Sequence, residues 1–246
     1  MTSYANVLDE ALVARTEVPS FGSSFDVAEA YGIQEELVGR RIARGERIVG
    51  VKMGLTSRAK MQQMGVDEAI WGRLTDAMRI PDGGVLDLSQ RIHAKVEPEV
   101  AFLVRGGEIA AIAPALEVID SRYLDFKFTL PDVIADNTSA AAFVVGAWQP
   151  VPSGVDNLGV LLELDGRTVE IGSTAAILGD PRRAFAAASR LAGNLEDDWI
   201  VLAGAATAAV TVAPGTHVQV TVEKLGTASL KASSLPGASA LAGAEK

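Results

Sequence analysis

The chain of 246 residues contains no cysteine, and this absence excludes disulfides, thiol nucleophiles and thiolate metal sites. Histidine is almost as scarce. The two that exist, His93 and His217, each lie near the end of an expected strand without a matched partner, so we expect surface or structurally satisfied side chains at both. A metal site built without Cys or His would use hard oxygen ligands.

Basic residues are fewer than acidic residues. Lys and Arg number 22 against 31 Asp and Glu, the net charge is −9, and no run of five or more basic residues occurs. Such a chain attracts neither nucleic acid nor an anionic membrane, and we expect neither as a partner. An anionic small-molecule substrate would need a local cation, either a side chain or a metal.

A long apolar run is missing as well. The longest, 199–214, is too short and too rich in Ala, Gly and Thr for a membrane span. The stretch 1–17 carries acids where a signal peptide needs an apolar core, so we expect it to be retained. With 48% hydrophobic and 22% charged residues the composition is globular, and we expect a cytoplasmic protein.

What is present indicates an α+β fold, with an α-rich N-terminal part packed on a mixed β-sheet body. Apolar residues at helical spacing predict helices over 4–17 and 23–46. The segment 47–55 then has the pattern of a short strand, with glycines that permit close approach of backbone or ligand. A short helix is expected over 57–65.

From about residue 80 the pattern changes to short β-like segments separated by turns. We expect strands over 81–88, 95–104, 115–128, 141–148, 160–172 and 217–230, and a helix over 180–195. The expected organisation is one functional domain. It has a helical part over 1–80, a β-rich catalytic body over 81–232 and a disordered tail over 233–246.

Two acids stand out in the segment KVEPEVAF, residues 95–102. On a strand, Glu97 and Glu99 share one face, while the alternate positions form a wholly apolar face that must be core. Two close, partly desolvated carboxylates repel each other unless a cation lies between them, and oxygen ligands favour Mg²⁺ or Mn²⁺. For this pair alone, the alternative to a metal site is a strand face on which both acids are solvated. Pro98 indicates an edge or a bulge at this point.

Other polar residues in apolar surroundings extend this pattern. Glu117 and Asp120 each offer a third ligand. The polar segment 132–139 adds further oxygen-bearing side chains, and the alternative interpretation of this segment is an ordinary polar turn. Lys52 lies among apolar residues, so it is either desolvated and available for an anionic substrate or proton transfer, or packed with its head in solvent. Residues 172–179 offer N–H groups or hydroxyls to a carboxylate, or form a capped turn.

Six ordered stretches resemble the 2-keto-4-pentenoate hydratase and 4-oxalocrotonate decarboxylase family of the fumarylacetoacetate-hydrolase superfamily. They are VGVKMGLTSRAKMQQMGV, WGRLTDAM, KVEPEVAF, PALEVIDSRY, FTLPDVIADNTS and GSTAAILGDP, and the likeness runs from about Ala11 to Leu230. The resemblance implies a mixed β-sheet fold around Mg²⁺ or Mn²⁺. It also implies a small 2-oxo acid substrate in the meta-cleavage breakdown of aromatic compounds, and assembly into a homo-oligomer.

The resemblance further implies roles for individual residues. The implied metal ligands are Glu97, Glu99 and Glu117. Lys52 matches the family's active-site lysine, and Asp76 and Ser139 match polar positions that line the site, so these three are the expected catalytic residues. The expected substrate-binding residues are Leu55, Thr56, Ser57, Ser173 and Thr174.

Within the family the resemblance is stronger to the decarboxylases, because the hydratases tend to have Ala where Pro98 stands here. We therefore expect decarboxylation of 4-oxalocrotonate, with hydration of 2-hydroxypentadienoate as the alternative. A decarboxylase must accept a terminal carboxylate at the far end of its substrate, whereas a hydratase needs a positioned water. The cationic candidates for that far end are Arg58, Lys60, Arg73 and Lys127.

One departure from the family concerns the link between Glu99 and Glu117, which is shorter than expected, as if a helical insertion were missing. This link favours a further alternative, a non-catalytic subunit that supports an active partner enzyme. A simple binding protein for 2-oxo acids is a third possibility. We still expect the metal site to form. The resemblance also implies a complex with the hydratase that takes the decarboxylation product.

Overall fold

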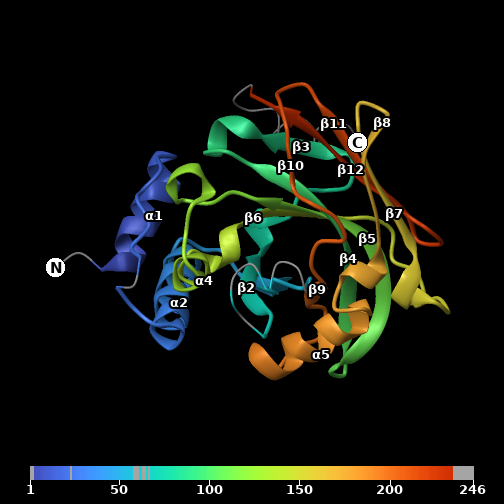
Figure 1. Ribbon diagram of the computed structural model, residues 1–246, viewed down its shortest axis with the longest axis horizontal. Coiled ribbons are helices and arrows are strands. Elements are labelled where there is room, and N and C mark those ends of the chain that lie inside the picture. Colours follow the sequence, from blue (N-terminus) through green and yellow to red (C-terminus); the bar gives the residue numbers. More distant parts are fainter. Residues whose placement is uncertain (1–2, 23, 58–60, 63–64, 66, 235–246) are drawn as a thin grey trace.

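The computed structural model describes residues 3–22, 24–57, 61–62, 65 and 67–234. Two β-sheets pack against each other, and helices α1, α2 and α4 gather beside them while α5 lies at another side (Figure 1). The helices are α1 (Tyr4–Ala14), α2 (Val27–Ala43), α4 (Leu130–Ala135) and α5 (Pro181–Leu191). This arrangement confirms the expected α+β class with mixed sheets.

The larger sheet has seven strands. In order across the sheet they are β2 (Ile70–Thr75), β1 (Ile48–Gly54), β9 (Ile200–Leu202), β4 (Lys95–Arg105), β5 (Glu108–Ile119) and β6 (Ala140–Val145), and β10 (Val210–Thr211) pairs with β4. The smaller sheet has the order β3 (Gly84–Asp87), β12 (Gly226–Ser233), β11 (His217–Val222), β7 (Gly159–Leu164) and β8 (Arg167–Ser173).

The main core fills the space between the two sheets, where β5 contacts β11 and β12 and β4 contacts β7. The apolar face predicted for β4 is confirmed, since Val96, Val100, Phe102 and Val104 are fully buried in this core. The ring of Phe185 on α5 meets Phe102 edge to face, with centroids 5.9 Å apart. The opposite face of β4 is thereby turned away from the core between the sheets.

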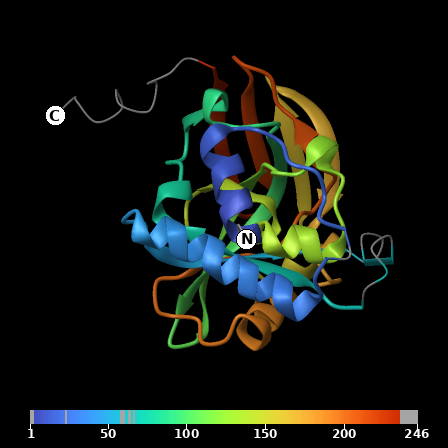
Figure 2. The same ribbon diagram turned by 90° about the vertical axis from the view of Figure 1, so that its left-hand side faces the viewer.

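A second apolar cluster joins the N-terminal helices to α4. Leu8, Leu37 and Ile134 are buried in it together with Tyr123, and Figure 2 shows the three helices side by side. Ile70 of β2 belongs to the same cluster. The helices are therefore held against the edge of the larger sheet by apolar packing.

Several elements differ from the expectations. The sequence patterns do not predict β2, β9, β10 or α4, because elements of two to six residues are too short to show a period. The expected strand over 115–128 ends at Ile119, and a short 3₁₀ turn (Leu124–Phe126) follows. Most of the expected helix over 57–65 and nearly all of the tail over 233–246 lie outside the described residues.

The expected boundary near residue 80 does not coincide with a break between sheets. The last described N-terminal helix ends at Ala43, and β1 and β2 already belong to the larger sheet. Strand β1 runs parallel to β9 and antiparallel to β2. No helix among the described residues is long and apolar enough to cross a membrane.

A buried carboxylate ties α4 to the N-terminal part. Asp132 is fully buried, and it accepts hydrogen bonds from Ser20 Oγ at 2.6 Å and from the Phe21 N–H at 3.1 Å. It also accepts the Thr129 N–H at 2.9 Å, which completes a capping box at the start of α4. The Asp132 carboxylate thus satisfies hydrogen-bond donors from residues 20–21 and from residue 129, which water would otherwise have to satisfy.

We expect Asp132→Asn to lower the free energy of unfolding by about 3 kcal/mol, because an amide nitrogen would then face donors that the carboxylate satisfies. Urea unfolding followed by circular dichroism measures the change. Asp156→Asn, at an exposed position, is the matched control and should leave stability unchanged. Equal stability of the two variants would contradict this structural role for Asp132.

Candidate metal centre and substrate cavity

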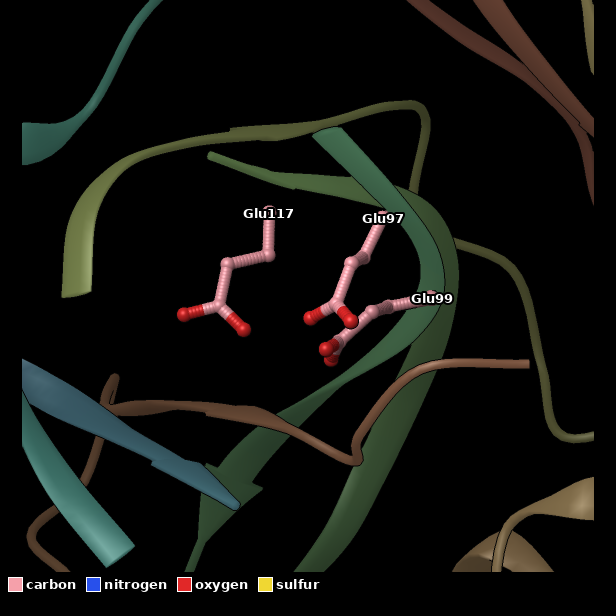
Figure 3. Close-up of side chains that lie close together, drawn as sticks. All are labelled: Glu97, Glu99 and Glu117. Carbon is pink, nitrogen blue, oxygen red and sulfur yellow. The ribbon is translucent and has the colours of Figure 1, made fainter. Parts of the chain in front are cut away.

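The hairpin of β4 and β5 brings acids face to face. Glu97 lies directly opposite Glu117 in the antiparallel register, and Glu99 follows two residues along the same face. Like charges placed opposite each other on a sheet destabilise the pairing unless they are compensated. Figure 3 shows the three side chains converging from the two strands.

The short link between these acids is a tight turn. Arg105 pairs with Glu108, and only Gly106 and Gly107 connect the two strands. Both glycines have left-handed φ angles, 57° and 76°, as a two-residue hairpin turn of type I′ requires. The helical insertion that the family led us to expect is absent at this point, and the three acids still come together.

The three carboxylates form a compact buried cluster. One oxygen from each lies within 4.8 Å of the other two, and the exposed fractions of Glu97, Glu99 and Glu117 are 7%, 0% and 1%. A solvated strand face, the alternative from the sequence, is therefore wrong. Within the described part of the chain, Glu99 Oε1 and Glu117 Oε2 accept no hydrogen bond. Buried carboxylate oxygens normally have partners, so these atoms are available to a ligand.

Lys52 on β1 is buried beside this cluster. Its Nζ lies 3.0 Å from Glu117 Oε1 and donates a hydrogen bond to the Thr138 carbonyl oxygen at 3.1 Å. Burial alone would lower the pKa of Lys52, but the carboxylates, Glu117 first, more than offset this and raise the pKa. Lys52 is therefore an ammonium ion at neutral pH, and the alternative in which its head reaches solvent is wrong.

Burial also acts on the carboxylates. It raises the pKa of Glu99 well above its ordinary value and that of Glu117 to about 7, and neighbouring carboxylates add to both effects. If all three glutamates are ionised, Lys52 compensates one negative charge and leaves two. A divalent cation supplies the missing charge, and an all-oxygen donor set suits Mg²⁺ or Mn²⁺. The residues present thus fit such an ion.

Gly204 holds Glu99 in place through its backbone. Its N–H donates to Glu99 Oε2 at 2.8 Å, and its φ of 109° lies in the region that favours glycine. A Cβ at this position would lie 2.0 Å from Thr56 Oγ1, and Thr56 is itself buried. Glycine is therefore required here both by the backbone conformation and by the packing.

Residues 137–139 form a strained turn next to Lys52. Their φ angles are 48°, 52° and 59°, which cost free energy for residues other than glycine. The side chain of Asn137 holds the turn, because Oδ1 accepts the Arg73 N–H at 2.7 Å and Nδ2 donates to the Arg73 carbonyl at 2.9 Å. The turn directs the Thr138 carbonyl oxygen to Lys52.

A cavity of about 490 Å³ lies at this cluster, a size suited to a small organic molecule. The polar residues of its lining are Lys52, Glu97, Lys127 and Thr138. Its apolar lining residues are Leu55, Ile70, Ile119, Phe126, Phe128 and Val133. The cavity therefore joins the buried charge cluster to a mainly apolar wall.

Only some of the expected substrate-binding residues lie at this cavity. Leu55 lines it, and Thr56 packs against Gly204 nearby. Ser57 borders a separate hollow. Ser173 Oγ donates to Asn157 Oδ1 at 2.7 Å, and Thr174 donates to the Val155 carbonyl at 2.7 Å, so both hydroxyls serve the local turn. The structure favours the capped-turn alternative for this segment.

Of the other candidate site residues from the sequence, one lies next to the site and two are paired elsewhere. Ser139 is buried next to Thr138, and its Oγ has no hydrogen-bond partner among the described residues. Asp76 lies outside the cavity lining and pairs with Arg47 at 3.0 Å. Backbone and side-chain hydrogen bonds from Arg47 lower the pKa of Asp76. Asp120 accepts two backbone N–H groups instead of joining the glutamates.

Several residues that shape the site were missed in the sequence. Gly204 lies in an apolar stretch and has no side chain that could mark it. Thr138 lies in the polar segment 132–139 that the sequence singled out, but its role through the carbonyl oxygen has no side-chain signal. Phe126 and Phe128 were assigned to a strand rather than to a cavity wall. A left-handed backbone at positions other than glycine has no reliable mark in a single sequence.

Comparisons with known proteins identify close relatives. The chain is 49% identical over 243 residues to a 4-oxalocrotonate decarboxylase of Pseudomonas sp., covering 92% of this chain and 95% of that protein. It is 36% identical over 210 residues to a 2-keto-4-pentenoate hydratase of Paraburkholderia xenovorans, covering 77% and 78%. No family model matches the chain.

Solved structures agree with these relatives. The 4-oxalocrotonate decarboxylase from Pseudomonas putida G7, complexed with magnesium and adipate, superposes with a TM-score of 0.86 at 38% identity, covering 93% of this chain and 95% of that one. A fumarylacetoacetate hydrolase family protein from Yersinia pestis has a TM-score of 0.56 at 14% identity, covering 74% and 91%, and shares the fold alone. The expected superfamily fold is thereby confirmed.

We expect Mg²⁺ or Mn²⁺ to raise Tm more at about pH 8 than at about pH 5.5, because protons compete with the ion for carboxylates whose pKa is raised. The pKa of Glu117 rises from 4.5 to about 7 on folding, so the metal-free fold binds the extra proton and loses stability as pH rises through this window. Thermal melts with and without metal measure the difference. A Tm increase independent of pH would contradict this account.

Gly204→Ala should weaken Mn²⁺ binding at least about tenfold, because the new Cβ displaces Thr56 and the N–H that holds Glu99. Isothermal titration calorimetry measures the affinity. Gly226→Ala is the matched control, since Gly226 has a similar φ of 97° but open space around a Cβ. The same affinity loss in both variants would assign the effect to backbone strain rather than to the Glu99 contact.

Proposed function

This chain belongs to the family of 4-oxalocrotonate decarboxylases and 2-keto-4-pentenoate hydratases, and we propose that it is the decarboxylase. The reaction is the metal-dependent conversion of 4-oxalocrotonate to 2-hydroxypenta-2,4-dienoate and CO₂, which makes the chain a lyase. The observation that carries the proposal is the buried triad of Glu97, Glu99 and Glu117 beside the ammonium of Lys52 at a cavity. The higher identity to a decarboxylase than to a hydratase favours this branch.

We propose Glu97, Glu99 and Glu117 as the residues that hold Mg²⁺ or Mn²⁺. When bound, the ion supplies Lewis-acid stabilisation for negative charge that develops at the 2-oxo acid end of the substrate. Gly204 fixes the orientation of Glu99 and leaves its other oxygen without a partner among the described residues. The protein thus keeps its ligand atoms preorganised on two paired strands.

Lys52 provides a fixed positive charge and a proton at the same end. In the reaction the bond between C5 and the distal carboxyl carbon breaks, and CO₂ leaves. The electron pair moves through the conjugated carbons to the 2-oxo oxygen, which then takes a proton. The Lys52 ammonium, held by the Thr138 carbonyl, is placed to attract the carboxylate at C1 or to give that proton.

The apolar lining favours the loss of the distal carboxylate. A carboxylate becomes neutral CO₂ in this step, so surroundings with few hydrogen-bond donors stabilise the product relative to the charged reactant. Ile70, Ile119 and Val133 contribute such surroundings to the cavity. Ser139 and Asp76 remain predicted catalytic residues. Ser139 is the better supported of the two, because its buried hydroxyl has no hydrogen-bond partner among the described residues.

Hydration of 2-hydroxypentadienoate is the second candidate function. It is supported by the hydratase relative and would use the same carboxylates. We also propose a homo-oligomer in the cytoplasm that associates with the hydratase taking the decarboxylation product. These assignments of assembly, location and partner rest on the family.

An ultraviolet assay with 4-oxalocrotonate, first with Mg²⁺ and then with EDTA, tests the function. Loss of substrate with CO₂ release only in the presence of metal supports the decarboxylase. Metal-dependent consumption of 2-hydroxypentadienoate alone would make the chain the hydratase. No turnover of either compound by a protein that binds Mg²⁺ would favour a supporting subunit or a binding protein.

Glu97→Gln should reduce metal affinity and lower turnover by at least about a hundredfold, because it removes one anionic ligand from a cluster of three. Steady-state kinetics and metal analysis of the same preparation measure both effects. Glu108→Gln, at an exposed position on the same hairpin, is the control and should behave as the parent. Full metal content with normal turnover in the Glu97 variant would exclude Glu97 from the site.

A further inference from the structure

The distal carboxylate of the proposed substrate needs a cation in an acidic protein. Two of the candidates from the sequence, Arg58 and Lys60, lie outside the described residues. Arg73 stacks over Trp71, with its guanidinium carbon 4.7 Å from the ring centroid, and does not line the cavity. Lys127 lines the same cavity as Lys52.

We propose that Lys127 is the specificity-determining residue that binds the distal carboxylate of a dicarboxylic 2-oxo acid, an inference that rests on the proposed function. Among the described residues of the lining, Lys52 and Lys127 are the cations. Lys52 is buried against the glutamate cluster, whereas the Lys127 side chain is 79% exposed. The two cations therefore lie at the buried and the solvent-facing parts of one cavity, as the two anionic ends of the substrate require.

The segment that carries Lys127 has a fixed backbone. Asp125 and Phe126 adopt left-handed φ angles of 55° and 56°. The Asp125 N–H donates to Glu17 Oε1 at 3.1 Å, and His93 Nδ1 lies 2.8 Å from the same oxygen. Such angles persist only where the surroundings impose them, so this rim of the cavity is preorganised.

Aromatic contacts hold the same rim. The Phe126 ring contacts the His93 ring, with centroids 4.4 Å apart, and the Lys95 ammonium lies 4.1 Å from the Phe126 centroid. Phe126 and Phe128 both line the cavity on either side of Lys127 in the chain. They offer an apolar wall to the conjugated carbons while Lys127 meets the charged end.

The present partner of Lys127 can be replaced by a ligand. Its Nζ lies 3.0 Å from Asp125 Oδ2, and both side chains are largely exposed. Ion pairs between exposed groups are weak, so a substrate carboxylate displaces Asp125 at little cost. The lysine can thus turn from Asp125 to the substrate without unpairing a buried charge.

The position of Lys127 also fits the chemistry. A cation on the leaving carboxylate stabilises the charged substrate more than the transition state, in which that charge is being lost, so a strong contact would oppose decarboxylation. An exposed lysine gives a weak contact that selects dicarboxylates without retaining the carboxylate. Lys127 should therefore affect KM rather than kcat.

The test uses two saturated probes of equal length, 2-oxoadipate and 2-oxohexanoate, which differ only in the distal carboxylate. With saturating Mg²⁺, we expect the parent protein to bind 2-oxoadipate about fivefold more tightly in calorimetry. Lys127→Met should abolish this preference without changing affinity for 2-oxohexanoate or Mg²⁺, and Lys127→Arg should keep it. Lys231→Met, on β12 and exposed, is the control and should match the parent.

Turnover of 4-oxalocrotonate supplies a second readout. Lys127→Met should raise KM about fivefold with kcat unchanged or higher, whereas a merely structural role would lower kcat and Tm. An unaltered preference for 2-oxoadipate in Lys127→Met would overturn the inference while parent turnover still supports the decarboxylase. If the parent prefers 2-oxoadipate and Lys127→Met loses that preference, but the parent does not turn over 4-oxalocrotonate, Lys127 is retained as the dicarboxylate-binding residue and the proposed function is overturned instead.

Discussion

The structure around the site depends on one electrostatic constraint, the burial of three carboxylates beside a single ammonium. Cross-strand pairing of Glu97 with Glu117 would be unfavourable on any sheet, and burial makes it more so. Lys52 offsets part of the charge, and the shortfall of two positive charges is what a divalent cation supplies. Burial first, and the neighbouring carboxylates second, raise the pKa of both Glu99 and Glu117.

The surrounding fold keeps this cluster in a fixed geometry. The smaller sheet covers the apolar face of β4, which leaves the opposite face to the glutamates. Gly204 and the strained turn over residues 137–139 bring backbone groups to Glu99 and Lys52 from outside the hairpin. Because the hairpin itself positions the acids, its closure by Gly106 and Gly107 does not disturb the cluster.

The cavity joins two environments that a decarboxylation needs. Its buried part is charged and suits the 2-oxo acid end of the proposed substrate, and its apolar wall suits a carboxylate that leaves as neutral CO₂. Lys127 adds charge only where solvent weakens it. In the proposed reaction, substrate recognition at the rim and stabilisation of developing charge at the base act on opposite ends of one small molecule.

The sequence by itself determined the α+β class, the buried face of β4, and the pair of acids that demands a cation, because these follow from alternation and residue type within one segment. Its ordered motifs also indicated the family. The residue pattern left Glu117 and Asp120 open as the third acid, the family resemblance indicated Glu117, and the tertiary structure places Glu117 in the cluster. Only the tertiary structure decided that the hydroxyls of Ser173 and Thr174 serve a turn. It also showed that β1 brings Lys52 to strands far along the chain. These contacts join segments far apart in the sequence, and their partners depend on register and on left-handed backbone angles that local patterns do not encode.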